Sequence, residues 1–361
     1  MKPKVYFASV RTEESLITHL GKMFDLAFPN LLKKDDLTAI KIHFGEFGSH
    51  AFIRPVFVRQ IVEKIKENNS KPFISDTNTL YKGHRQNSVD HLNNAIANGF
   101  GYACTQAPLI IADGLWGRDY KNVKVDLKHF KEVKIGNAFV QADSMVVMSH
   151  MTGHLASGFG CAIKNVAMGC SSRAGKQQQH DSSKPKVNPK QCISCGKCVA
   201  NCPVDAIAMN EKALIDQNKC IGCAECVTVC PTQAIAIMWG GMGKKEMQEM
   251  MCEYAYGATK GKRVGYINFL MNITPACDCW PVSNAYFVHD IGILASSDLL
   301  AIDKASIDLV QKSAGNPNSK LKNPKTNDKF KDLWGIDVMQ HFSYGKKIGL
   351  GSMDYELVNV N

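Results

Sequence analysis

Two short stretches decide the fold of part of this chain: CISCGKCVANCP at residues 192–203 and CIGCAECVTVCP at residues 220–231. Both follow the spacing C-x-x-C-x-x-C-x-x-x-C-P, and together they hold eight of the chain's 14 cysteines. Each two-residue gap lets the backbone curl around a corner, so the first three thiols of a stretch can meet at one centre. The fourth thiol stands apart, before a proline. Two such stretches in tandem therefore predict two metal centres that exchange their fourth ligand.

This spacing is that of bacterial two-cluster ferredoxins, and it predicts two [4Fe–4S] clusters that carry single electrons. Zinc knuckles use pairs of cysteines rather than repeated groups of four. Disulfides are implausible between thiols this close in a chain without a secretion signal. One cluster is expected on Cys192, Cys195, Cys198 and Cys230, and the other on Cys220, Cys223, Cys226 and Cys202.

The cysteine stretches interrupt a larger body. A length of 361 residues allows two or three domains. We expect the first part of an α/β body at 1–186, a ferredoxin-like α+β insert at 187–238, and the second part of the body at 239–361. The polar stretch at 171–190 is interpreted as the linker into the insert, and the glycine-rich residues 240–243 as the linker out.

The body alternates strand patterns with helix patterns, which predicts a mainly parallel sheet with helices on both faces. The expected strands are 5–10, 37–44, 72–75, 144–149 and 263–271, with further extended segments at 107–112 and 123–135. The expected helices are 14–28, 53–66, 89–98, 244–256 and 298–312, the last with Ser297 as its N-cap.

The net charge of +10 does not indicate a nucleic-acid-binding protein. The lysines are dispersed, and two clusters with their thiolates would lower the total to roughly +6. No apolar run reaches the roughly 18 residues that a membrane span needs. The N-terminus also lacks the apolar stretch and cleavage site of a signal peptide. A cytoplasmic protein of a reducing, oxygen-poor cell interior is therefore expected.

A second site is expected at the ends of the predicted strands, because open α/β sheets bind ligands beyond the carboxyl ends of their strands. The catalytic candidates at these ends are His43, Asp76, His150, His154, Cys277 and Cys279. An alternative explanation is that polar residues follow strands simply because loops are polar. The sequence alone leaves both explanations open.

The segment Cys277-Asp278-Cys279 and the glycine-rich residues 158–169 refine this expectation. In an extended run both thiols lie on one face, where they can hold a third metal together with a nearby histidine or act as a redox pair. They can also be two small residues in a packed turn. Lys164 and Asn165 follow glycines whose N–H groups suit a small anionic ligand, although a glycine-rich loop packed on the sheet fits equally well.

Four segments resemble the domain-of-unknown-function family 362: KIHFGE at 41–46, SDTN at 75–78, GFGCAIKN at 158–165 and DIGILASSD at 290–298. The resemblance covers nearly the whole chain. Members of that family often carry a two-cluster ferredoxin insert at this place, so the resemblance implies an iron–sulfur protein of anaerobic metabolism. It implies neither a substrate nor catalytic residues.

These observations favour an oxidoreductase that passes single electrons through two [4Fe–4S] clusters to a site on the α/β body. Its expected partners are a redox protein (a ferredoxin, a flavodoxin or a reductase) and a small anionic substrate. One alternative is an electron carrier or subunit with no chemistry of its own. Another is a metal- or cofactor-assembly protein in which Cys277 and Cys279 handle an ion.

Overall fold

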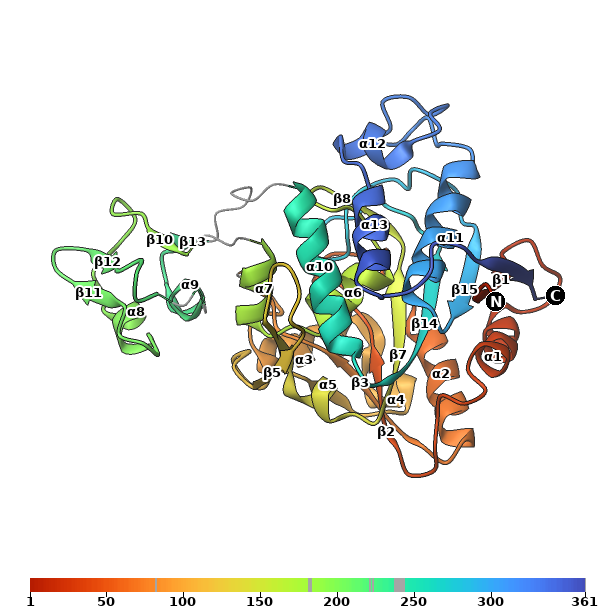
Figure 1. The fold of residues 1–361 in the computed structure, drawn as a ribbon, viewed down its shortest axis with the longest axis horizontal. Helices are drawn as coiled ribbons and strands as arrows, with labels where there is room; N and C mark the ends of the chain where they lie inside the picture. The colour runs from red at the N-terminus through yellow and green to blue at the C-terminus, as the bar shows by residue number, and fades with distance from the viewer. Residues whose placement is uncertain (82, 181–183, 221, 223, 237–243, 361) are drawn as a thin grey trace.

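The computed structural model of the protein describes residues 1–81, 83–180, 184–220, 222, 224–236 and 244–360. The body is built on an eight-stranded sheet (Figure 1). Its strands, in spatial order, are β16 (Glu356–Asn359), β1 (Lys4–Ser9), β15 (Gly292–Ser296), β14 (Arg263–Leu270), β7 (Ser144–His150), β2 (Leu37–Lys41), β3 (Lys71–Asp76) and β4 (Leu109–Ile111). All neighbours pair in parallel except β15, which is antiparallel to both β1 and β14. The predicted mainly parallel α/β sheet is confirmed.

Both faces of the sheet are covered because its central strands are apolar on both sides. Along β7, Met145 and Val147 belong to one buried cluster, whereas Val146 and Met148 belong to a second cluster. The first cluster includes residues of α6 (Ala162–Gly169), α10 (Lys244–Thr259) and α11 (Leu299–Lys312). The second includes residues of α1 (Leu16–Ala27) and α2 (Pro55–Glu67).

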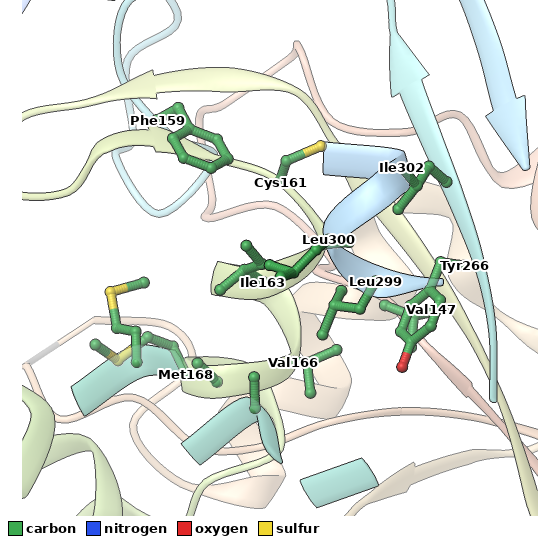
Figure 2. Close-up of a cluster of buried hydrophobic side chains, with 14 of the residues drawn as sticks. Val147, Phe159, Cys161, Ile163, Val166, Met168, Tyr266, Leu299, Leu300 and Ile302 are labelled. Carbon is green, nitrogen blue, oxygen red and sulfur yellow. The ribbon is translucent and has the colours of Figure 1, made fainter. Parts of the chain in front are cut away.

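The core of the first face surrounds α6 (Figure 2). Ile163 and Val166 of this helix are fully buried, as is Val147 of β7. Leu299 and Leu300 at the start of α11 belong to the same cluster. The close packing sets the position of α6 relative to the ends of β7 and β2, which matters for the pocket described below.

Smaller elements complete the body. Two hairpins stand apart from the central sheet: β5 (Tyr120–Lys124) with β6 (Glu132–Gly136), and β8 (Thr152–His154) with β9 (Gly158–Gly160). The remaining helical segments are α3 (Ser88–Ala95), η1 (Ile96–Phe100), α4 (Tyr102–Thr105), α5 (Asn137–Gln141), α7 (Arg173–His180), α12 (Lys329–Trp334) and α13 (Met339–Lys347). No helix in the described part of the chain is long and apolar enough to cross a membrane.

The cysteine-rich segment folds as a small module after α7 (Figure 1). Its elements are β10 (Lys186–Val187), α8 (Lys197–Ala200), β11 (Ile207–Met209), β12 (Ala213–Ile215), α9 (Glu225–Val229) and β13 (Ile235–Ala236). β10 pairs with β13 and β11 pairs with β12, both antiparallel. The predicted boundary between 238 and 239 and the predicted linker at 240–243 lie outside the described residues.

Three local expectations differ from the structure. Residues 173–180 form α7 rather than a linker, because Gln179 and Lys176 bond to the body instead of to water. The N-cap of α11 is Asp298, whose side chain accepts from the N–H of Ala301, and not Ser297. The segment 123–135 is not one extended run but parts of the β5–β6 hairpin with a turn between them.

Candidate functional site

The candidate site lies where four neighbouring strands of the body end. β14, β7, β2 and β3 are adjacent and parallel, so their carboxyl ends meet at one edge of the sheet. This edge is where open α/β sheets bind ligands. A small pocket lies there. We call this pocket the rim pocket. Its wall includes His43, His150, Lys164, Asn165, Cys277 and Asp278.

His150 and Asp278 form an ion pair in the wall of the rim pocket. Nδ1 of His150 lies 2.8 Å from Oδ1 of Asp278, and Nε2 lies 2.8 Å from the carbonyl oxygen of Met271. Both partners are acceptors, so both ring nitrogens carry protons. Burial lowers the pKa of His150, but the charge of Asp278 and these hydrogen bonds outweigh burial and raise it. His150 therefore orients Asp278 and is not a free base.

His43 is the neutral histidine of the rim pocket. Its Nδ1 accepts a hydrogen bond of 3.0 Å from the N–H of Gly45, so its proton resides on Nε2. Burial, followed by the charges of Arg85 and Lys41, holds the pKa of His43 well below its usual range. The Nε2–H group of His43 can therefore donate a hydrogen bond to a bound ligand.

Lys164 supplies positive charge to the rim pocket. It lies in the first turn of α6, where the carboxylate of Asp303 accepts from the N–H groups of Ala162 and Ile163 at 2.9 and 2.8 Å. Burial lowers the pKa of Lys164 to about 8, although Asp278 acts to raise it. Within the described residues its ammonium group makes no hydrogen bond or ion pair, which leaves it available to a small anion.

Asn165 holds the wall in place. Its Oδ1 accepts from Nζ of Lys41 at 2.6 Å, and its Nδ2 donates to the carbonyl of Met148 at 2.9 Å and to Oγ of Ser149 at 3.0 Å. These bonds tie α6 to β2 and β7. The amide group of Asn165, which was predicted to help bind a small anionic ligand, is thus engaged within the protein.

Asp76 lies beneath the rim pocket in a buried network of charges. Its Oδ1 is 3.2 Å from Nζ of Lys41, and both side chains are almost completely buried. Arg85 lies 3.9 Å from Asp76 and pairs with Glu46 at 3.1 Å. Burial raises the pKa of Asp76, but the charges of Lys41 and Arg85 outweigh it and lower the pKa. Asp76 therefore balances the charge below the pocket and is not part of its wall.

Lys41 and Asp278 are not among the predicted site residues. Lys41 ends β2 between Ile40 and Ile42, and all three are fully buried. A lysine inside an apolar strand is itself a signal, because a buried cation needs a partner. Asp278 lies between Cys277 and Cys279, and the prediction for this segment considered only the two thiols.

Cys277 and Cys279 are joined by a disulfide. Cys277 is in the wall of the rim pocket, whereas Cys279 is not. Metals bind thiolates, so a third metal at this pair requires the disulfide to be reduced first. Among the described residues, no three His, Cys, Asp or Glu side chains are grouped closely enough to hold a single metal ion.

His154 lies apart from the rim pocket. Its Nδ1 accepts from the N–H groups of Ala156 and Ser157 at 3.2 and 3.0 Å, so its ring closes the turn between β8 and β9. Burial holds the pKa of His154 well below its usual range. The structure brings together His43, His150 and Cys277, but not His154.

The module contains two small hollows, and both are lined with cysteines. The first hollow is lined by Cys192, Cys195, Cys198 and Cys230. The second hollow is lined by Cys202, Cys220 and Cys226. Cys223, the predicted fourth ligand of the second cluster, lies outside the described residues. Each hollow thus draws thiols from both cysteine stretches.

Backbone amides point at two of these sulfur atoms. The N–H of Ala206 lies 3.2 Å from Sγ of Cys202, and the N–H of Gly222 lies 3.4 Å from Sγ of Cys220. Hydrogen bonds to ligand sulfur are one of the means by which proteins set the potential of a cluster. Both bonds belong to the second hollow.

The module contacts the body next to this second hollow. Leu80 of the body packs against Ala224 and Val227 of the module. Beside this contact, Arg118 of the body donates to Glu225 at 2.5 Å and to Asn201 at 3.2 Å. The second hollow is therefore the one whose cysteine loop touches the body.

Fold and site together define an α/β protein with a pocket at the strand ends of its sheet and a cysteine-rich α+β module inserted after α7. The chain belongs to the family described as Domain of unknown function (DUF362), which matches residues 38–308. The matched range includes both cysteine stretches and every residue in the wall of the rim pocket. No curated protein matches the chain.

Two solved structures are similar in fold. The lactate racemase apoprotein from Thermoanaerobacterium thermosaccharolyticum is 12% identical, with a TM-score of 0.39 over 82% of this chain and 55% of that chain. A structural genomics target from Thermotoga maritima is 10% identical, with a TM-score of 0.40 over 72% of this chain and 50% of that chain. This chain spans about half the length of each. At these values the likeness says nothing about activity.

Proposed function

We propose that this protein is an iron–sulfur oxidoreductase of the cytoplasm, in which two [4Fe–4S] clusters in the module pass single electrons to the rim pocket. The observation that carries this proposal is the crossed arrangement of the module, because each hollow takes cysteines from both stretches. A cubane needs four thiolates that are spread around it, and the first hollow offers four: Cys192, Cys195, Cys198 and Cys230.

The rim pocket supports a small anionic substrate. Lys164 would bind its negative charge, since its ammonium group has no hydrogen bond or ion pair within the described residues. His43 would donate to it through Nε2. The pair of His150 and Asp278 would hold the opposite wall in position. When bound, the clusters supply the electrons, and these side chains supply binding and orientation.

The first hollow is the side that suits a redox partner such as a ferredoxin, a flavodoxin or a reductase. Cys195 in the wall of this hollow is exposed, and Ile193 in the same wall is 61% exposed. An exposed apolar residue next to a redox centre provides a small docking surface for a transient partner. The second hollow, by contrast, lies next to the body.

A metal- or cofactor-assembly role is the second candidate, and one observation favours it. Cys277 and Asp278 share the wall of the rim pocket, where a reduced thiol and a carboxylate together suit a transient metal ion. This role predicts transferable metal in the reduced protein and no turnover.

The proposal is tested on anaerobically purified protein by its iron and acid-labile sulfide content and by EPR of the reduced sample. We expect about eight iron and about eight sulfide per chain, in two interacting cubanes. Cys192→Ser and Cys226→Ser should each remove about half of both, because each removes a ligand of one cluster. Cys104→Ser, at an exposed free cysteine of α4, is the matched control and should change nothing.

Stoichiometric zinc without sulfide would contradict the cluster proposal. So would a full iron content in both ligand variants. Intact clusters together with an extra metal that is lost in Cys277→Ser/Cys279→Ser would favour the assembly role.

A further inference from the structure

The disulfide at the rim pocket has no structural role that would explain it. It links residues only two positions apart, so the closed loop contains a single intervening residue, Asp278. A disulfide stabilises a fold mainly by shortening the unfolded chain, and this effect is smallest for the shortest loops. Asp278 is already held by its ion pair with His150. The Cys277–Cys279 disulfide therefore suggests a role in redox chemistry rather than in stability.

A continuous path joins the module to this disulfide. Ala224, two residues before Cys226, packs against Leu80, and both side chains are almost completely buried at 1% and 3% exposure. The next residue, Tyr81, donates from its hydroxyl to the carbonyl oxygen of Cys279 at 3.2 Å. Packed, covalent and hydrogen-bonded contacts thus lead from the loop of the second hollow to the backbone of the disulfide.

Tyr81 is fixed in this position by its surroundings. The guanidinium of Arg85 donates to the Tyr81 hydroxyl and also to Glu46, which keeps the ring from turning away. Burial raises the pKa of Tyr81 to about 12, so its hydroxyl keeps the proton that it donates to Cys279. The hydroxyl is therefore a stable link in the path.

We propose that the Cys277–Cys279 disulfide is the two-electron acceptor of the module, and that electrons reach it through Leu80 and Tyr81. The proposal rests on the proposed function, since the electrons come from the two clusters. In this proposal, the disulfide collects two single electrons from the module and is reduced by both. Because Cys277 is in the wall of the rim pocket, the resulting thiols are next to a bound substrate.

The electron count of the module matches the reaction. Each [4Fe–4S] cluster carries one electron, so two reduced clusters hold the two electrons that a disulfide needs. The first electron breaks the S–S bond and leaves one thiolate and one thiyl radical. The second electron converts the radical to a thiolate. Two protons from water at the mouth of the pocket give Cys277-SH and Cys279-SH, and the redox partner then reduces both oxidised clusters again.

The experiment measures the thiol state of the pair after the clusters are reduced. Anaerobic protein is reduced with photoreduced deazaflavin, treated with iodoacetamide under denaturing conditions and digested with trypsin. The tryptic peptide from Val264 to Lys304 contains only these two cysteines, so its mass reports the disulfide directly. We expect both cysteines to be alkylated in the wild type, and the visible absorption of the oxidised clusters to return as the disulfide is reduced.

Matched variants test the path. Cys226→Ser removes a ligand beside the body and should leave the peptide in its disulfide form. Tyr81→Phe keeps the ring but loses the bond to Cys279, and it should slow disulfide reduction severalfold with an unchanged iron content. Tyr102→Phe, at an exposed tyrosine of α4, should behave as the wild type.

The two possible failures are distinguishable. If the protein contains no clusters, the proposed function fails and this inference fails with it. If the clusters are present and stay reduced while the peptide keeps its disulfide, only this inference is wrong. It is equally wrong if the disulfide is reduced as fast in Cys226→Ser as in the wild type, because the electrons then bypass the module.

Discussion

The module and the body collect their reactive side chains in opposite ways. In the module, both hollows are lined by residues of one short segment, 185–235, and within the described residues its buried core is small and includes two cysteines, Cys198 and Cys226. In the body, the rim pocket joins residues as far apart as His43 and Cys277, and two large apolar clusters hold the strands that carry them. With the proposed clusters bound, the module should therefore depend on metal for its stability, whereas the body should depend on packing and buried charge pairs.

The largest effect is expected when the charge network beneath the rim pocket is broken. Lys41→Met leaves Asp76 buried without its closest cation, which should lower the free energy of unfolding of the body by about 3–5 kcal/mol. Urea unfolding followed by tryptophan fluorescence measures this. The iron content of the folded protein should not change, since the module does not contain Lys41.

Two further variants show whether burial is the cause. Lys64→Met removes a lysine that pairs with Asp25 and Glu67 on the surface, and it should cost less than about 1 kcal/mol. Lys41→Met combined with Asp76→Leu removes both buried charges and should recover most of the stability. If Lys41→Met and Lys64→Met lowered the free energy of unfolding equally, the buried charge network would stabilise the body no more than a surface ion pair does.

A smaller effect is expected from His91, a fully buried histidine in α3 whose ring nitrogens have no hydrogen-bond partner among the described residues. Burial lowers its pKa from 6.5 to about 3. A base with a lowered pKa in the folded state contributes stability above its unfolded pKa, and that stability is lost as the pH falls from 6.5 towards 3. At about pH 4 the loss is at most about 3.5 kcal/mol, since each pH unit below 6.5 is worth ~1.4 kcal/mol.

In His91→Leu, the midpoint of urea unfolding should fall less steeply below pH 6.5 than it does in the wild type. His50→Leu, at an exposed histidine, should keep the slope of the wild type. An unchanged slope in His91→Leu would mean that other buried groups account for the acid sensitivity of the body.

Gly169→Ala tests how closely α6 approaches Lys41. A Cβ atom at Gly169 would lie 2.2 Å from Cε of Lys41, whose ammonium is held by Asn165 and Asp76. We expect a loss of about 1–3 kcal/mol in the unfolding free energy of the body. Gly101→Ala is the control, since its nearest neighbour would be 3.8 Å away, and it should stay within about 0.5 kcal/mol of the wild type.

The smallest effect concerns the contact between the two regions. Arg118→Ala removes a partly exposed ion pair with Glu225, worth about 0.5 kcal/mol. Hydrogen exchange at Leu80 and Ala224 should become faster, and added salt should produce the same change in the wild type. If Arg59→Ala, which breaks a surface pair within α2, had the same effect on these amides, the contact would not depend on this ion pair.

The grouping of the module's cysteines around two hollows is predictable from the sequence because the information is local. The repeated spacing groups the cysteines without knowledge of the sheet. The long apolar helices and strands of the body, such as α1 and β7, are predicted for the same reason, since their periodicity lies within one element. The antiparallel strand β15 and the edge strand β16 follow from tertiary pairing, which no local pattern reports.

The rim pocket is only partly predictable. Strand ends indicate His43, His150 and Cys277, because parallel strands bring their carboxyl ends to one edge. Polar composition misleads at α7, where Gln179 bonds to Ser171 and to backbone carbonyls instead of to water. The roles of Lys41 and Asn165 depend on a 2.6 Å contact between β2 and α6, which are far apart in sequence.

The pairing of β10 with β13 has a consequence for how this protein is constructed. Lys186 faces Ala236 across an antiparallel ladder, so the two ends of the module leave it side by side, about 5 Å apart. For the sheet of the body, the whole segment from Lys186 to Ala236 is topologically equivalent to a single tight turn. A different small module, or a plain hairpin, can therefore replace it without rerouting any strand.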